Sequence, residues 1–197
     1  MSTRKVSLFG AGAGMLSLLL PYFSVKPNRI SPGNPVSVFG LNGGPETAAV
    51  LCLIIALAAV AVFSLSHNVC RRVCGVGIGG ILVLLSALVL LILTGARLAG
   101  MEYGRISPGA GFWLLLFALL FVFDAVLREK GAPRPYTAAV KLVPPLLIAA
   151  AVLSGSLNHL AVMMEFSNRS TRFFEELSAH VSLASSAVAA SVMIGVP

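Results

Sequence analysis

The sequence predicts an all-α, polytopic membrane protein with five to six transmembrane helices. Of its 197 residues, 57% are hydrophobic and only 11% are charged, whereas roughly 25% of a soluble domain is charged. Several separate apolar stretches also reach the ~20 residues that a helix needs to cross a bilayer core of ~30 Å. Because lipid offers the backbone no hydrogen-bond partners, these long apolar stretches are expected to be helices.

Six stretches are candidate membrane spans. They cover residues 6–23, 47–66, 73–94, 111–127, 138–163 and 181–197. The first follows two basic residues, as a secretory signal would, but "PYF" at 21–23 stands where small residues would mark a cleavage site. We therefore expect an uncleaved anchor. The last stretch, of 17 residues, is at the low edge of the ~17–25 needed to cross.

Lysine and arginine residues are distributed unequally between the two sides of these spans. If the N-terminus is inside, the inner set is Arg4, Lys5, Arg71, Arg72, Arg128, Lys130, Arg134 and Lys141. The outer set is Lys26, Arg29, Arg97, Arg105, Arg169 and Arg172. This excess on the inner side predicts a cytoplasmic N-terminus. The net charge of +7 then reflects contact with an anionic lipid bilayer, and we expect no nucleic-acid partner.

Few polar residues lie within the predicted spans. Asp124 in "LLFVFDAVLREK" has Arg128 one helical turn later, so we favour an ion pair at the inner membrane interface over a proton relay. Asn158 and His159 lie near the outer end of the fifth span and could face neighbouring helices or water. They give no defined binding site.

The three cysteines predict no metal centre. Cys52 lies inside the second span, where a buried small hydrophobic side chain is the ordinary role. Cys70 and Cys74 stand near His67 in "HNVCRRVC". A zinc site needs four ligands, and no second cluster completes one. We expect two reduced cytoplasmic thiols, with no metal and no cofactor.

Glycine and proline mark packing positions and helix ends. "GAGAG" at 10–14 lies inside an apolar span, so we expect close helix packing there rather than a dinucleotide loop. The pentapeptide "RISPG" occurs at 29–33 and at 105–109. Both copies should interrupt helices, and we treat the repeat as chance turn chemistry. Pro144 and Pro145 predict a kink or a helix start.

Motifs of catalysis are missing from the sequence. It has no phosphate-binding loop of the G-x-x-x-x-G-K-[ST] type, no H-E-x-x-H and no G-x-S-x-G. We therefore predict that the chain is not an enzyme, with no catalytic or cofactor-binding residues. An intramembrane enzyme acting through Asp124 or His159 is therefore the weak hypothesis.

The C-terminal stretch predicts an amphipathic helix that leads into the last span. Ser170 can cap this helix, and the acidic pair at 175–176 suits its positive end. Phe173, Leu177 and Val181 then share one face at helical spacing. Such a segment is typical of a helix at the membrane interface.

This stretch carries a family resemblance. "FSNRSTRFFEELSAH", followed by an apolar run that ends in "IGVP", resembles the entry to the transmembrane domain of binding-protein-dependent ABC importer permeases for glycine betaine and choline. "PNR" at 27–29, "GAGFWL" at 109–114 and "SGSLNHLAVMMEF" at 154–166 are similar to the Yeh-type osmoprotectant permeases. In that family, extra N-terminal helices precede the conventional permease domain.

The resemblance implies a division of the chain and a set of partners. Residues 1–166 would be an N-terminal membrane region of about five spans, and residues 167–197 would be the amphipathic helix and first span of a permease domain that continues beyond them. The partners implied are a separate ATP-binding subunit, a periplasmic substrate-binding protein and a second permease subunit. No coupling or substrate-binding residue can be carried over, so the substrate-binding residues are unknown. The alternative is a complete small helical membrane protein with a structural or assembly role.

Overall fold

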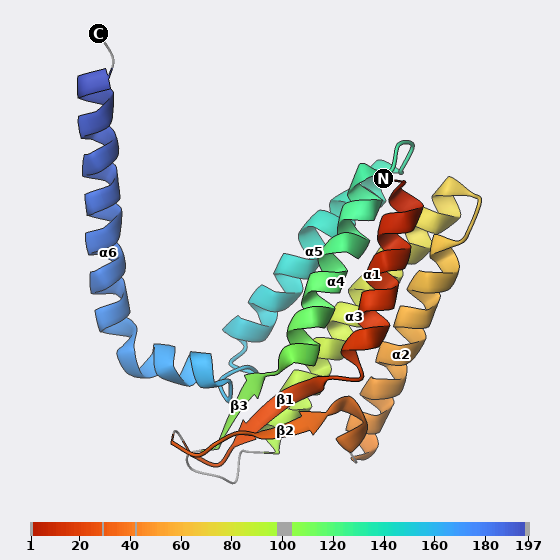
Figure 1. Ribbon diagram of the computed structural model, residues 1–197, viewed down its shortest axis with the longest axis horizontal. Helices are drawn as coiled ribbons and strands as arrows, with labels where there is room; N and C mark the ends of the chain where they lie inside the picture. The colour runs from red at the N-terminus through yellow and green to blue at the C-terminus, as the bar shows by residue number, and fades with distance from the viewer. Residues whose placement is uncertain (1, 29, 42, 98–103, 196–197) are drawn as a thin grey trace. The chain divides into compact units, whose positions relative to one another are not determined.

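The computed structural model describes residues 2–28, 30–41, 43–97 and 104–195. The chain forms two compact units, Met1–Leu160 and Ala161–Pro197. The described residues form six α-helices, one short 3-10 helix and three β-strands (Figure 1). Five of these helices, all except the first, are long and apolar enough to cross a membrane. The predicted class, an all-α polytopic membrane protein, is confirmed.

The first unit is a bundle of five helices. These are α1 (Thr3–Ser17), α2 (Gly44–Ser64), α3 (Val69–Ala96), α4 (Ala110–Arg128) and α5 (Arg134–Leu153). Helix α3 packs against α2, α4 and α5, and it is the most buried of the helices long enough to span. Helix α1 packs mainly against α4. The core between them is apolar and rich in valine, including Val60, Val76 and Val122.

Two of the predicted spans have the wrong bounds. The first was expected over 6–23, but α1 ends at Ser17 and Pro21–Lys26 forms a strand. The fifth was expected over 138–163, but α5 ends at Leu153. Gly155 follows this end with a φ of +72°, a conformation that commonly terminates helices and that glycine adopts without steric cost. Helix α5 also runs through Pro144 and Pro145, so a helix start at these prolines is wrong.

A small antiparallel sheet, which the sequence did not predict, covers the end of the bundle opposite the N-terminus (Figure 1). The strands are β1 (Pro21–Lys26), β2 (Asn34–Ser37) and β3 (Arg105–Pro108), in the order β2-β1-β3. The 3-10 helix η1 (Val38–Gly40) follows β2.

The sheet packs onto the start of α4 through aromatic side chains. Tyr22 and Phe23 are fully buried, and the Tyr22 ring meets the rings of Phe23 and Phe112 edge-on at 5.1 and 5.7 Å. Burial raises the pKa of the Tyr22 phenol. The Ile106 amide donates to the His159 carbonyl at 3.1 Å, so residues just before α6 are joined to β3. These contacts hold the connecting segments against the bundle.

The two copies of "RISPG" have different structures. The second copy forms β3, whereas the described residues of the first lie in the connection between β1 and β2. The described residues of both copies lie outside helices, as predicted. The lack of a shared backbone structure supports the interpretation of a chance repeat.

Glycine allows α1 to approach α4 and α2 closely, in line with the helix packing that the sequence predicted. A Cβ added at Gly10 would lie 2.9 Å from both the Ala118 carbonyl oxygen and a Val122 methyl group, and one added at Gly14 would lie 2.6 Å from a Leu57 methyl group. Both glycines are buried. Small residues one helical turn apart therefore form the contact surface of α1.

The second unit consists of helix α6 (Ala161–Gly195). Its backbone leaves helical geometry at Arg169, with φ −132° and ψ 19°, and Figure 1 shows the helix changing direction there. This kink lies one residue before Ser170, where the sequence predicted a new helix to begin. The rings of Phe166, Phe173 and Phe174 contact one another across the kink at 5.4 to 6.0 Å.

Gly10→Ala is expected to destabilise the bundle by about 1–3 kcal/mol, because the new methyl group overpacks the contact between α1 and α4. Gly12→Ala is the matched control in the same helix, since a Cβ there meets nothing within 4 Å. Thermal unfolding of the purified protein in detergent should show a lower midpoint for Gly10→Ala and an unchanged or higher one for Gly12→Ala. Equal midpoints for the two variants would contradict the close approach.

Candidate functional site

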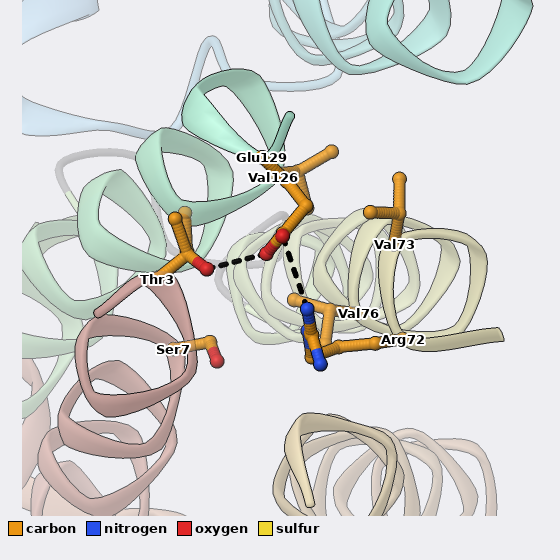
Figure 2. A pocket seen from close by; sticks show the side chains of 8 residues that line it. Thr3, Ser7, Arg72, Val73, Val76, Val126 and Glu129 are labelled. Carbon is orange, nitrogen blue, oxygen red and sulfur yellow. Dashed lines mark hydrogen bonds and ion pairs between the residues drawn. The ribbon is translucent and has the colours of Figure 1, made fainter. Parts of the chain in front are cut away.

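Polar side chains from three helices meet at the end of the bundle that carries the N-terminus (Figure 2). The Glu129 carboxylate lies between the Thr3 hydroxyl and the Arg72 guanidinium. The hydroxyl donates to Glu129 Oε2, and Arg72 Nη2 lies 3.0 Å from Glu129 Oε1. We call these three residues the Glu129 clamp, because they join α1, α3 and the end of α4.

Local sequence places Arg72, the cation of the clamp. The Asn68 side chain accepts a hydrogen bond from the Arg71 amide at 3.2 Å and so caps the start of α3, which fixes Arg72 in the first turn. Arg72 Nη1 also donates to the Ser66 carbonyl at 2.9 Å, in the connection from α2. The Arg72 and Glu129 side chains are only 15% and 14% exposed. Both charges are therefore largely removed from solvent and depend on each other.

The space beside the clamp is too small for a substrate. Its volume is about 10 Å³, room for about one water molecule. The lining residues are Thr3, Ser7, Arg72, Val73, Val76, Ala125, Val126 and Glu129. Arg72 Nε is buried and has no hydrogen-bond partner among the described residues. This geometry suits the joining of helices rather than the binding of a solute.

A second ion pair lies at the opposite end of α3. Glu46, in the first turn of α2, is 3% exposed, and its Oε1 lies 2.5 Å from the Nε of Arg97, which caps the end of α3. A Cβ at Gly43 would lie 2.0 Å from both Glu46 Oε2 and Arg97 Nη2, so this glycine leaves room for the pair. We call Glu46 and Arg97 the Glu46 clamp. Helix α3 is thus tied to α4 at one end and to α2 at the other.

The polar residues that the sequence singled out lie outside both clamps. Asp124 and Arg128 form the predicted i, i+4 pair, with Arg128 Nε 2.6 Å from Asp124 Oδ1 and both side chains well exposed. Asn158 and His159 lie after the end of α5, not within a span. Cys52 is exposed on the surface of α2, so its predicted burial is wrong.

Sequence reasoning missed both clamps. It counted Arg72 and Arg97 only as markers of membrane topology, and it assigned no role to Glu46 or Glu129. The available signal was the scarcity of acidic residues, seven in all, since a charge at the end of a span needs a partner nearby. Spacing along the chain could not identify that partner, because each pair joins two different helices.

Between the clamps the bundle is packed with apolar side chains. Among the residues described, no group of three or more His, Cys, Asp or Glu side chains is placed to hold a metal ion. The ring contacts of Tyr22 and Phe23 with Phe112 fill the end covered by the sheet. The arrangement can hold helices at fixed positions.

Residues 3–163 match the sequence family described as the N-terminal domain of the ABC transporter permease YehY. The chain belongs to this family. Comparison with curated proteins and with solved structures gives no match. The YehY family match spans the five-helix bundle and its sheet and ends in the first turn of α6. It confirms the resemblance to the Yeh-type permeases and identifies a multi-pass membrane component of a transporter that works with ATP-binding and other ABC subunits.

Glu129→Gln is expected to destabilise the bundle by about 2 kcal/mol, because it leaves the shielded Arg72 guanidinium without a counter-charge. Asp124→Asn is the matched control, because it removes a carboxylate of an exposed pair one turn earlier, where the expected cost is about 0–1 kcal/mol. Chemical or thermal unfolding in detergent measures both. In the double variant Arg72→Met/Glu129→Gln, the loss should be smaller than the sum of the single losses. Additive losses, or equal effects of the two single carboxylate variants, would contradict the clamp.

Proposed function

We propose that the chain is the N-terminal membrane portion of a binding-protein-dependent ABC importer permease for glycine betaine or related osmoprotectants. The match of residues 3–163 to the YehY N-terminal domain carries this proposal. The glycine betaine class rests on the resemblance of the segment around "FFEELSAH" and "IGVP". We further propose that the five-helix bundle is a scaffold for the permease core and not the solute path.

Packing and charge support the scaffold role. Alternating access requires an element with two packing arrangements. Here the most buried spanning helix, α3, is tied at both ends by ion pairs with Nε–Oε1 and Nη2–Oε1 distances of 2.5 and 3.0 Å. The cavity beside the Glu129 clamp has a volume of about 10 Å³. The rings of Tyr22, Phe23 and Phe112 are buried and pack against one another, so these three offer no open aromatic face of the kind that usually holds a quaternary ammonium ligand.

The remaining parts of the importer follow from this assignment. An ATP-binding subunit would hydrolyse ATP, a periplasmic substrate-binding protein would select the solute, and a second permease subunit would complete the path. Residues 167–197 would be the amphipathic helix and first span of the permease domain, after an N-terminal region of 1–166. The family of ABC importer permeases supports a bacterial inner membrane, and the distribution of Lys and Arg supports an N-terminus in the cytoplasm. On that orientation the small sheet faces the periplasm.

Uptake of radiolabelled glycine betaine tests the function. The gene cluster that encodes the chain would be expressed in a bacterium that lacks its own betaine uptake systems. We expect uptake that requires both the ATP-binding subunit and the binding protein. Unlabelled choline or a related betaine should compete with the labelled solute, and the Asp124→Asn variant should retain uptake. Uptake of another solute but not of betaines would contradict the substrate class. If the complex forms stably but takes up no solute in an ATP-dependent way, the result would favour the structural or assembly role.

A further inference from the structure

Two thiols lie side by side at the start of α3. Cys70 and Cys74 are one helical turn apart, with 3.9 Å between their sulfur atoms. Cys70 is exposed and Cys74 is partly buried. Neither belongs to a clamp or to any proposed step of transport. We propose that Cys70 and Cys74 form a two-coordinate binding site for a soft, thiophilic cation such as Cu(I).

The helical geometry favours a bridging ion over a disulfide. Side chains at i and i+4 of a helix have Cβ atoms ~5–6 Å apart, whereas a disulfide needs Cβ atoms ~3.5–4.5 Å apart. Closing the S–S bond would therefore distort the first turns of α3, which Asn68 caps and Arg72 anchors to Glu129. A bridging ion needs no such change. With the ~2.3 Å of a zinc–thiolate bond as a guide, two metal–sulfur bonds on opposite sides of an ion span up to ~4.6 Å. Small side-chain rotations can reach this separation from 3.9 Å.

The number and type of ligands select the kind of ion. Thiolates prefer soft ions such as Cu(I), and a structural zinc site needs four ligands. The sequence excluded zinc for this reason, but the spacing alone could not give the distance between the two sulfur atoms. Among the described residues no third His, Cys, Asp or Glu joins the pair in a metal-binding group. The site therefore suits an ion that needs only two ligands.

Binding of the cation changes the charge of the site. One monovalent cation forms two sulfur–metal bonds, and the two thiol protons leave to water. The resulting site carries one negative charge.

Copper titration of the purified full chain tests the site. Cu(I) would be added without oxygen to protein in detergent, in competition with a coloured Cu(I) chelator, and bound copper would be measured per chain together with the ultraviolet absorption of the copper–thiolate bond. We expect one Cu(I) per chain for the wild type. Cys70→Ser and Cys74→Ser should each weaken binding by more than ~10-fold, which is ~1.4 kcal/mol.

Cys52→Ser is the matched control, because Cys52 is an exposed thiol on α2 with no cysteine beside it. This variant should bind copper like the wild type. Circular dichroism and thermal unfolding would show that all three variants are folded. Unchanged binding in a folded Cys70→Ser or Cys74→Ser variant would overturn the proposal, as would loss of binding in Cys52→Ser. A Cys70–Cys74 disulfide, found by mass spectrometry in protein handled in air, would overturn the geometric preference for a bridging ion.

Discussion

A charged side chain at the edge of a bilayer needs a partner, and α3 carries an arginine near each end. Arg72 pairs with Glu129 at the end of α4, and Arg97 pairs with Glu46 at the start of α2. Because the carboxylates are largely shielded from solvent, each pair depends on both of its members. The two pairs set the position of α3 against its neighbours. Helix α1 completes the bundle, with a close approach to α4 at Gly10 and to α2 at Gly14.

The membrane-spanning parts of the fold could be predicted from hydropathy. Lipid forces long apolar segments into helices, so α2, α3 and α4 begin and end within a few residues of their expected bounds. The same criterion failed at "PYF" (residues 21–23), which hydropathy assigned to the first span but which lies in β1. Strand pairing depends on residues far apart in sequence, here β1 with β3. Hydropathy also failed at Gly155. The positive φ of this residue accompanies the end of α5, within a stretch that hydropathy treats as continuous.

The candidate site was less predictable than the fold. The Asp124–Arg128 pair was predictable because its members are on one helix, one turn apart. The clamps were not, because the choice of Glu129 for Arg72 is made by the packing of α3 against α4. The same limit applied to Cys70 and Cys74, where the sequence gave the helical spacing but not the contact between the sulfur atoms. In each case the missing information was an interatomic distance set by tertiary structure.

The central claim is that the bundle is a rigid scaffold beside a moving permease core. Spin labels on exposed positions of two helices, at Ile55→Cys on α2 and Phe117→Cys on α4, would report this directly in the assembled transporter after the native cysteines are replaced. Pulsed electron paramagnetic resonance would measure the distance between the labels without nucleotide, with ATP and after hydrolysis. We predict one distance distribution that is the same in all three states. A shift of this distribution with the nucleotide state would contradict the scaffold role and would place the bundle among the moving parts of the importer.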